Sequence, residues 1–394
     1  MPESVQLPFE QPDPMRPAPL LRRLQHRGPI HAIRTAVGDP AWLVTGYDEV
    51  RALLDDDRLG RAHRDPERAS RTGESALFGG PMGEFATERA DHGRTRSLLQ
   101  PHFSPKRMRA LRGRVEQLTA GLLDELEAAG PPADLHAALA LPLPIAVICE
   151  LLGVPYEDRA RFRQWTQAAA DVTDRARSEQ GLAELFCYGQ RLVARKRDTG
   201  GDPDADVISR LAATDGVSDD EAASLGMLLL FAGHETTVTA IGEGVVWLLA
   251  APGQWQALVE DPSRIGPAVE EILRAPGLGG GGIPRYARTD LDIAGVHVSE
   301  GELVLLDLGA ANHDDAVFAD PDRFDLDRPA AAHLSFGHGA RYCIGAPLAR
   351  IELEVVFAQL TTRFPTLRLG CAVEELSFKV HTLTGGPAEL PVIW

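Results

Sequence analysis

A single cysteine in a glycine-rich loop, residues 336–347, is the strongest candidate for chemistry in this sequence. The loop has the pattern F-G-x-G-x-x-x-C-x-G, whose fixed members are Phe336, Gly337, Gly339, Cys343 and Gly345. Glycines tolerate positive φ and carry no Cβ, so we expect the backbone to turn sharply here and to approach a flat ligand closely. A proline at 347 indicates a helix start, and the positive end of the helix dipole would favour the thiolate of Cys343. That thiolate could ligate a soft metal, whereas the alternative reading is a small, buried, apolar cysteine.

An acid beside an alcohol, Glu235 and Thr236, interrupts the long apolar segment 225–250. Burial of these groups in a helix is costly unless they have a purpose. The small residues Ala232 and Gly233 would let a diatomic ligand sit against the helix, while Thr236 donates a hydrogen bond and Glu235 supplies protons through water. The alternative is that the Thr236 hydroxyl only bonds back to the carbonyl one turn earlier.

Two charged pairs stand at helical spacing. Glu271 and Arg274 are three residues apart, which permits an ion pair, and His92 and Arg96 are four residues apart on one predicted helix face. Taken alone, both pairs are typical of a solvated helix surface. Arg285, in the predicted strand segment P-R-Y-A, can likewise be interpreted as a solvated surface cation.

Two better-known motifs are matched only by letter. His234 and Glu235 begin like the zinc motif H-E-x-x-H, but the fifth residue is Val238, so the second zinc ligand is missing. The glycine run 277–282 follows a predicted helix and leads to a proline, so it lacks the strand and helix of a dinucleotide-binding loop. A zinc or serine hydrolase is therefore disfavoured, and no G-x-S-x-G elbow occurs in the sequence.

The composition is that of a globular protein with a packed core. The chain has 394 residues, of which 44% are hydrophobic and 25% charged, and its net charge is −17. This charge disfavours binding to nucleic acid or to an anionic membrane. Four separated cysteines without a C-x-x-C pair, and no secretory signal, indicate a reducing cytoplasm. Polar residues within the apolar segment 225–250 favour a buried central helix over a membrane span.

The pattern along the chain predicts a mainly α fold (α+β). We expect residues 1–20 to be an irregular lead-in, followed by a strand at 42–44, a helix from 47, and a long loop over 60–83. Helices dominate from 105 to 249, with breaks at the Gly-Pro turns near 130, 153 and 200. Strands are expected between 283 and 308, a helix over 347–357, and short strands near 378–380 and 390–393. We interpret residues 1–394 as one domain.

The cysteine loop, the acid-alcohol pair and the charged pairs together resemble the soluble bacterial class of the cytochrome P-450 superfamily, the haem-thiolate monooxygenases. The resemblance spans the whole chain. It implies a single domain with a long central helix, many helices and small β-sheets around a buried haem b. Cys343 would ligate the iron, with Phe336, Gly337, Gly345, Ala232 and Gly233 close to the haem. Thr236 and Glu235 would be the catalytic pair that activates O2.

The resemblance also assigns the charged residues. His92, Arg96, Arg285 and Arg341 would hold the haem propionates, although Arg341 stands where many relatives have His. Glu271, Arg274 and Arg323, the last in a P-x-R-F segment, would form a structural network behind the haem. The substrate pocket would be lined by residues of four segments, namely Phe85, Leu229, Ala232, Gly233, Gly281, Ile283 and Thr382. We expect the run of glycines at 279–282 either to widen this pocket or to free the loop.

Electrons would come from NAD(P)H through a ferredoxin reductase and a ferredoxin. Residues 89–114 contain eight Lys or Arg and one acidic residue, a local charge of +7 against −24 for the remainder, which suits an acidic donor protein. The default reading of these cations is pairing with surface carboxylates. The expected enzyme is a cytoplasmic monomer that hydroxylates a hydrophobic polyketide, terpenoid or peptide, as in antibiotic biosynthesis. Alternatives are epoxidation, oxidative C–C or C–N coupling, or a haem protein without turnover.

Overall fold

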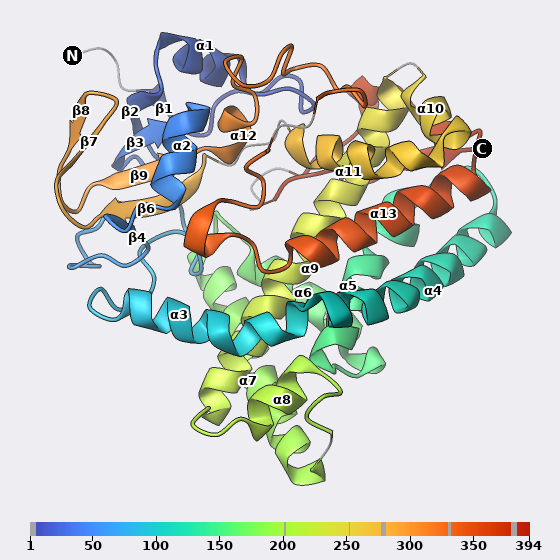
Figure 1. Ribbon diagram of the computed structural model, residues 1–394, viewed down its shortest axis with the longest axis horizontal. Coiled ribbons are helices and arrows are strands. Elements are labelled where there is room, and N and C mark those ends of the chain that lie inside the picture. Colours follow the sequence, from blue (N-terminus) through green and yellow to red (C-terminus); the bar gives the residue numbers. More distant parts are fainter. Residues whose placement is uncertain (1–4, 201, 252, 277–280, 330–331, 380–383) are drawn as a thin grey trace. The chain divides into compact units, whose positions relative to one another are not determined.

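The computed structural model describes residues 5–200, 202–251, 253–276, 281–329, 332–379 and 384–394 (Figure 1). The chain divides into two compact units. Unit 1 is drawn from residues 1–91 and 266–343, and unit 2 from residues 92–265 and 344–394. The single domain expected from the sequence stays a prediction.

Unit 1 is built on a six-stranded mixed sheet with the order β1-β2-β3-β9-β6-β4. Its strands are β1 (Val5–Gln6), β2 (Ile30–Arg34), β3 (Pro40–Val44), β4 (Leu59–Gly60), β6 (Ile283–Ala287) and β9 (Leu303–Leu306). A hairpin of β7 (Leu291–Ile293) and β8 (Val296–Val298) forms a separate two-stranded sheet. The helices are α1 (Pro19–Arg27), α2 (Tyr47–Leu54), α11 (Ile265–Arg274, whose first residue belongs to unit 2), α12 (Leu308–Ala311) and the 3-10 turn η5 (Gly339–Arg341).

Strand β9 shows why this sheet has a core on both faces. All four of its residues are apolar and buried, and successive side chains of a strand point to opposite faces. Leu303 and Leu305 pack with the cluster that includes α1, whereas Val304 and Leu306 pack with the cluster that includes α2. Because both faces of β9 are covered, its sequence is a continuous apolar run.

Unit 2 is mostly helical. Its helices are α3 (Glu88–Leu99, whose first four residues belong to unit 1), α4 (Pro105–Ala129), α5 (Pro142–Leu152), α6 (Arg159–Ala169), α7 (Arg175–Thr199), α8 (Val207–Ala213), α9 (Asp219–Ala250), α10 (Gln254–Glu260) and α13 (Ala346–Arg363). Short turns are η1 (Gln100–Phe103), η2 (His136–Ala140, π-helical), η3 (Tyr156–Asp158), η4 (Pro262–Arg264) and η6 (Val373–Glu375). A three-stranded sheet has the order β10 (Arg368–Leu369), β11 (Pro391–Ile393), β5 (Ala133–Asp134). Helices α4 and α13 run side by side (Figure 1).

Helix α9 is the central helix of unit 2. Ser218 caps its start, because its Oγ accepts a hydrogen bond from the backbone N of Glu221 at 3.1 Å. By length and composition alone it is long and apolar enough to cross a membrane. Most of its side chains are buried in unit 2, where it packs against α5 and α7. The helix is therefore a core helix, as the polar interruptions of its sequence predicted.

Most predicted elements are confirmed, with two differences. Helices α4, α5 and α7 end at the three Gly-Pro turns, and β3, α2, β6, β9 and α13 lie where the pattern placed them. The N-terminal stretch is not wholly irregular, because Val5–Gln6 pairs in parallel with Ile33–Arg34 as an edge strand. At the other end, Phe378 forms only an isolated bridge with Pro387, and Val380 lies outside the described residues.

Two glutamates are buried in unit 2 without an ion-pair partner among its described residues. Glu243 on α9 is 2% exposed and Glu352 on α13 is 1% exposed, and one carboxyl oxygen of each has no hydrogen-bond partner. Burial raises the pKa of each from 4.5 to about 8. Their protonated forms therefore stabilise the fold. This contribution is complete below the unfolded-state pKa and is lost as the pH rises through about 8.

We expect Glu243→Gln and Glu352→Gln to raise the free energy of unfolding at pH 9 by on the order of 1–3 kcal/mol each. Near pH 4, below the unfolded-state pKa, the variants should match the parent protein, because the neutral amide then replaces an acid that is neutral in both states. Thermal unfolding followed across this pH range provides the measurement. Glu354→Gln is the control on α13, since Glu354 forms an ion pair with Arg112. Parallel pH curves for parent and variants would contradict the prediction.

Candidate active site

The cysteine loop forms a tight turn in unit 1. The backbone N of Cys343 donates to the carbonyl of Phe336 at 2.8 Å, and the N of Gly337 donates to Leu334 at 2.7 Å. Gly337 and Gly339 have φ values of +74° and +68°, which glycine adopts without strain. A Cβ on Gly339 would also lie 1.8 Å from Asp55 Oδ1. The Cys343 side chain is exposed at the end of this turn, so the alternative of a buried apolar cysteine is wrong.

Gly345 behaves differently from the other two glycines. Its φ is −81° and its ψ −4°, which is a right-handed conformation open to any residue. The tolerance of glycine for positive φ is therefore not used at this position. Gly345 is the N-cap of α13, where its carbonyl accepts from the N of Ala349 at 3.0 Å. Phe336 is half-buried, with its ring 5.8 Å from the ring of His333.

Asn312 anchors the start of the cysteine loop and was not found from the sequence. Its Oδ1 accepts from the N of Leu334 at 2.7 Å, and its Nδ2 donates to Ser335 Oγ at 2.9 Å. The Ser335 hydroxyl in turn donates to the carbonyl of Leu273 at 2.6 Å. An isolated Asn carries no spacing signal, because its partners are 22 and 23 residues away.

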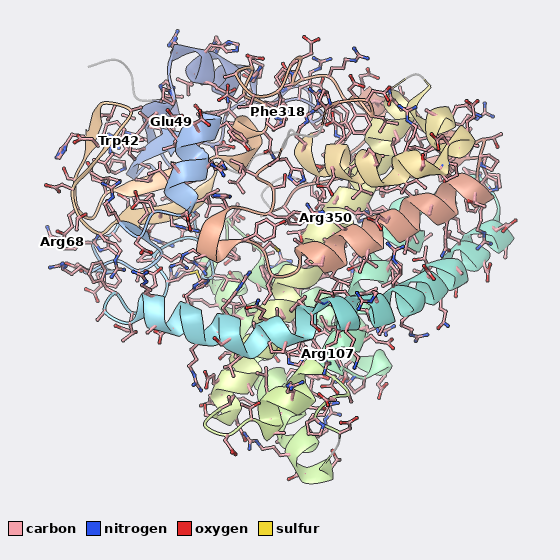
Figure 2. All side chains as sticks on the ribbon, viewed as in Figure 1. Trp42, Glu49, Arg68, Arg107, Phe318 and Arg350 are labelled. Atoms are coloured by element: carbon pink, nitrogen blue, oxygen red, sulfur yellow. The ribbon has the colours of Figure 1, made fainter. Side chains whose placement is uncertain are left out.

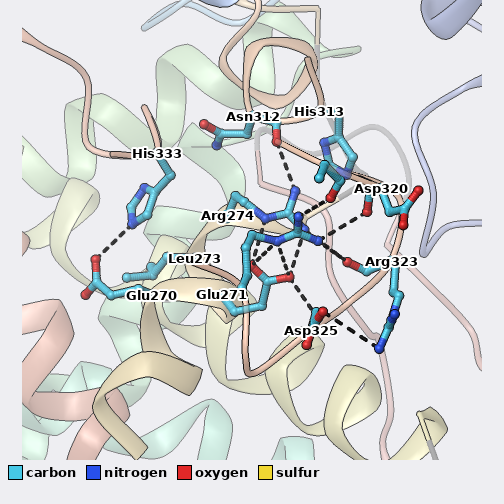
Figure 3. Close-up of polar contacts among 12 residues, drawn as sticks. Glu270, Glu271, Leu273, Arg274, Asn312, His313, Asp320, Arg323, Asp325 and His333 are labelled. Carbon is cyan, nitrogen blue, oxygen red and sulfur yellow. Dashed lines mark hydrogen bonds and ion pairs between the residues drawn. The ribbon is translucent and has the colours of Figure 1, made fainter. Parts of the chain in front are cut away.

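A buried ion network joins α11 to the segment after α12 (Figure 3). Arg274 donates to both carboxylate oxygens of Glu271, at 2.8 and 2.9 Å, so the pair is bidentate. Both side chains are at most 4% exposed. The same guanidinium donates to the carbonyl of Asn312 at 2.9 Å. The predicted pair of Glu271 and Arg274 is therefore present in the fold, and it connects to the cysteine loop through Asn312.

The third member of this network is Arg328, and not Arg323 as the family resemblance implied. Arg328 Nε lies 3.1 and 3.2 Å from the two oxygens of Glu271, and its side chain is 10% exposed. The side chain of Arg323 is 67% exposed and points to Asp325, 3.7 Å away (Figure 3). Arg323 contributes only its backbone carbonyl, which accepts from Arg328 at 2.6 Å. The chain turns between Arg323 and Arg328, so the Arg328 side chain lies against the Glu271 carboxylate.

Helix α9 presents a small exposed patch in an otherwise buried sequence. Ala232 and Thr236 are exposed, and the Thr236 hydroxyl donates to the carbonyl of Ala232 at 3.3 Å. The back-bonded alternative is thus the conformation seen, although the bond is long for a hydroxyl donor. A Cβ on Gly233 would lie 2.7 Å from Ile148 Cδ1 on α5, so helix packing alone requires this glycine.

Glu235 lies half-buried beside His234. His234 Nδ1 is 2.8 Å from the carbonyl of Leu230, which can only accept, so Nδ1 carries the hydrogen of this bond. Its Nε2 is 3.4 Å from Glu235 Oε1. Burial alone would raise the pKa of Glu235, but the contact with His234 and the charges of Lys379 and His136 bring that pKa below its usual value.

A cluster of arginines surrounds one carboxylate in unit 1. Arg341 donates to Glu88 Oε1 at 2.5 Å, and Arg288 donates to Glu88 Oε2 at 3.1 Å. Burial first, and then the charge of Arg341, lower the pKa of Arg285 to about 9. The structure therefore brings together Arg285 and Arg341, two of the predicted propionate ligands. Glu88 was not found from the sequence, because an acid in the first turn of a helix is common.

The other predicted ligands lie on α3. His92 and Arg96 are half-buried and belong to unit 2, whereas Arg285 and Arg341 belong to unit 1. The two halves of the predicted propionate set are thus carried by different units. Their spacing on one helix is as the sequence predicted.

The predicted pocket residues are placed as follows. Leu229 is buried in α9, whereas its neighbour Leu228 is 37% exposed. Ile283 begins β6, and the ring of Phe85 is stacked by Arg288, whose guanidinium carbon is 4.0 Å from the ring centroid. Thr382 lies outside the described residues, as do the glycines at 279 and 280.

Gly281 and Gly282 are required by the backbone. Their φ values are +91° and +89°, and an added Cβ would lie 2.9 Å from Leu7 and from the carbonyl of Leu306, respectively. A wider pocket is therefore not needed to explain these two glycines. Substitution of Gly281 would strain the loop whatever the substrate.

Comparison with known proteins agrees with this set of features. The profile described as "Cytochrome P450" matches residues 266–369. The chain is 44% identical to pentalenolactone synthase of Streptomyces exfoliatus over 403 residues, covering 100% of both chains. Among solved structures it is similar to PimD, a polyene macrolide antibiotic pimaricin epoxidase, with TM-score 0.89 and 40% identity over 100% of both chains. It is also similar to SgvP, a putative thioether synthase in griseoviridin tailoring, with TM-score 0.92 and 36% identity over 100% of both chains.

The fold is thus that of the haem-thiolate monooxygenases. The chain belongs to the cytochrome P450 family, and to its bacterial class.

The corrected network makes a direct prediction. Arg328→Ala should lower the free energy of unfolding by roughly 3–5 kcal/mol, because the buried Glu271 loses one of its two cations. Arg323→Ala should change it by about 0.5 kcal/mol or less, because the exposed side chain makes only a long ion pair. Urea unfolding of the two variants measures the difference. A larger loss for Arg323→Ala than for Arg328→Ala would contradict the assignment.

Proposed function

We propose that this protein binds haem b through Cys343 and uses it to oxidise a hydrophobic natural product. The observation that carries the proposal is the exposed Cys343 at the end of a glycine turn. The turn is closed by the hydrogen bond from the backbone N of Cys343 to the carbonyl of Phe336. Bound through the thiolate, haem iron activates molecular oxygen, and electron donation by the thiolate promotes O–O cleavage, as is known for this family.

The residues present fit this cofactor. Haem carries two carboxylates, and unit 1 provides guanidinium groups in excess of carboxylates around Arg285 and Arg341. Arg285 is 6% exposed, and among the described residues the only acceptor for its guanidinium is the carbonyl of Pro284, at 2.8 Å. Propionates would supply the missing charge, with His92 and Arg96 as further donors. Gly337 has no Cβ, which would leave room for a flat ligand to approach the loop.

Thr236 and Glu235 are the residues that we propose to manage protons. The long bond of the Thr236 hydroxyl to Ala232 leaves the hydroxyl able to turn toward a ligand on the exposed side of α9. With Nδ1 of His234 committed to Leu230, Nε2 and the Glu235 carboxyl can share a proton. This pair can hold a proton and pass it through water to the Thr236 side of the helix.

The substrate class is proposed from the relatives. Pentalenolactone synthase and the pimaricin epoxidase are named for antibiotic natural products. Hydroxylation is the default outcome, and epoxidation or oxidative coupling are alternatives that share the same haem chemistry. A cytoplasmic monomer that receives electrons from NAD(P)H through a ferredoxin reductase and a ferredoxin completes the proposal.

Two substitutions test the haem assignment and the catalytic one separately. Cys343→Ser should abolish the thiolate-type absorption of the reduced carbon monoxide complex, because the sulfur ligand is gone. Thr236→Ala should keep that absorption but lower the product formed per O2 consumed by roughly 100-fold, because a proton donor is lost. An unchanged spectrum of Cys343→Ser would refute the assignment of Cys343 as the iron ligand. Unchanged coupling in Thr236→Ala, with an O2 electrode as readout, would argue against the proton role of Thr236. A parent protein that consumes no O2 with a donor and candidate substrates would favour a haem protein without turnover.

The cationic segment 89–114 has few free charges for a donor protein. Five of its eight cations form ion pairs, for example Arg94 with Glu221 at 2.6 Å and Arg107 with Asp204 at 3.1 Å. Arg107 is labelled in Figure 2. The others in pairs are Arg89, Arg112 and Arg114. Lys106 and Arg109 are exposed near the start of α4 and have no ion pair among the described residues. We therefore propose these two as the contact for an acidic ferredoxin.

The double variant Lys106→Glu, Arg109→Glu should slow reduction by ferredoxin by roughly 10-fold at low salt, because electrostatic steering is reversed. Reduction by dithionite should keep its rate. Arg161→Glu on α6, also an exposed and unpaired cation among the described residues, controls for charge reversal in general. Stopped-flow absorbance gives both rates, and an equal slowing by dithionite would argue against a donor contact.

A further inference from the structure

Arg61 and Arg285 lie near one edge of the unit 1 sheet. Strands β4 and β6 are antiparallel, with Leu59 opposite Ala287 and Gly60 opposite Tyr286. Arg61 directly follows the last paired residue of β4, Arg285 directly precedes Tyr286 in β6, and the charge of Arg61 lowers the pKa of Arg285. Like charges this close destabilise a fold unless something compensates them.

The described part of the chain supplies one carboxylate for this region, and Glu88 is already engaged. Its Oε1 accepts from Arg341 at 2.5 Å and from the backbone N of Arg61 at 2.8 Å. Its Oε2 accepts from Arg288 at 3.1 Å and from the backbone N of Ala62 at 3.1 Å. Glu88 thus holds the Arg61 backbone and the Arg341 guanidinium in place, but it does not bind the Arg61 guanidinium.

The guanidinium groups of Arg61 and Arg285 have no carboxylate partner among the described residues. The contact shown for Arg61 is Nη2 to the sulfur of Met82, at 2.6 Å, and a thioether is a weak acceptor. Burial, followed by repulsion from Arg341, lowers the pKa of Arg61. The pKa of Arg285 is lowered by burial, by the charge of Arg341 and by the charge of Arg61, in that order. Four arginines, with Arg288 and Arg341 included, therefore share the single charge of Glu88.

We infer that Arg61 is a further carboxylate-binding residue of this protein, acting with Arg285 and Arg341 on a haem propionate, and that Glu88 is the positioning residue that holds Arg61 and Arg341 there. The inference rests on the proposed haem function. Arg61 was not among the ligands expected from the sequence. A carboxylate relieves the repulsion between the two guanidinium groups and gives Arg61 the charged acceptor that it lacks.

Haem loss from the purified holoenzyme tests this role. Arg61→Ala should transfer haem to excess apomyoglobin about 10-fold faster or more, as expected for the loss of a charge-assisted hydrogen bond. The rate of haem loss from Arg61→Lys, which keeps the charge, should lie between the rates of Arg61→Ala and of the parent protein. Arg64→Ala is the matched control in the same loop, since Arg64 is 69% exposed and pairs with Glu300 at 3.0 Å. It should lose haem at the parental rate.

Reconstitution of the full chain with haem dimethyl ester separates the charge from the packing. The ester lacks the propionate charges, so Arg61→Ala should not accelerate its loss relative to the parent protein. Equal acceleration for haem and for its ester would overturn the inference, as would a parental rate for haem. Normal haem retention combined with weaker spectral binding of decanoate would also overturn it, in favour of a substrate carboxylate.

Glu88 is tested by the reduction potential, which a purely structural role would not move. Glu88→Gln keeps an acceptor oxygen but removes the charge, so the potential of the haem iron should become more positive. Arg64→Ala should leave it unchanged, and an unchanged potential in Glu88→Gln would overturn the positioning role. Purification of the parent chain without haem would instead refute the proposed function itself, before any of these variants is compared.

Discussion

The charge of the buried Glu271 carboxylate is the constraint on which the organisation of unit 1 depends. A carboxylate at 4% exposure is tolerated only when cations and hydrogen bonds replace its water. Arg274 on α11 and Arg328 in the segment after α12 are these cations. Because Arg274 also reaches the carbonyl of Asn312, and Asn312 binds the start of the cysteine loop, the same network fixes where Cys343 emerges.

The second charged group of unit 1 follows the opposite principle. Around Glu271 both guanidinium groups, of Arg274 and Arg328, donate to the carboxylate itself, whereas around Glu88 the guanidinium groups of Arg61 and Arg285 have no carboxylate partner among the described residues. A buried network whose cations all bind its carboxylate is a structural element, since its donors are already used. Buried cations without a carboxylate are costly in the protein alone, and such groups are typical of binding sites for anions. The two clusters contain the same residue types and differ in whether each guanidinium reaches the carboxylate.

Individual residues show where sequence reasoning ended. The i,i+3 spacing of Glu271 and Arg274 predicted their ion pair, because helix geometry alone brings these positions together. Arg323 was instead assigned from the family resemblance, and that assignment is wrong for its side chain. Arg323 and Arg328 lie in one irregular segment, where no periodicity shows which side chain returns to the carboxylate. Glu88, Asn312 and Arg61 were missed for a related reason, because their partners are distant in the chain or are backbone groups.

The sequence by itself determined the chemistry that is available: a cysteine in a glycine turn, an acid beside an alcohol in an apolar helix, and the residues that cap and end the helices. These features are local, so spacing and residue type are sufficient to recognise them. Only the tertiary structure decided which guanidinium groups reach a carboxylate, that Gly233 and Gly281 serve packing and backbone conformation, and that Arg61 lies near Arg285. Those outcomes depend on strand register and on contacts between distant segments, which are settled by the packing of the whole unit and leave no pattern in a local stretch of sequence.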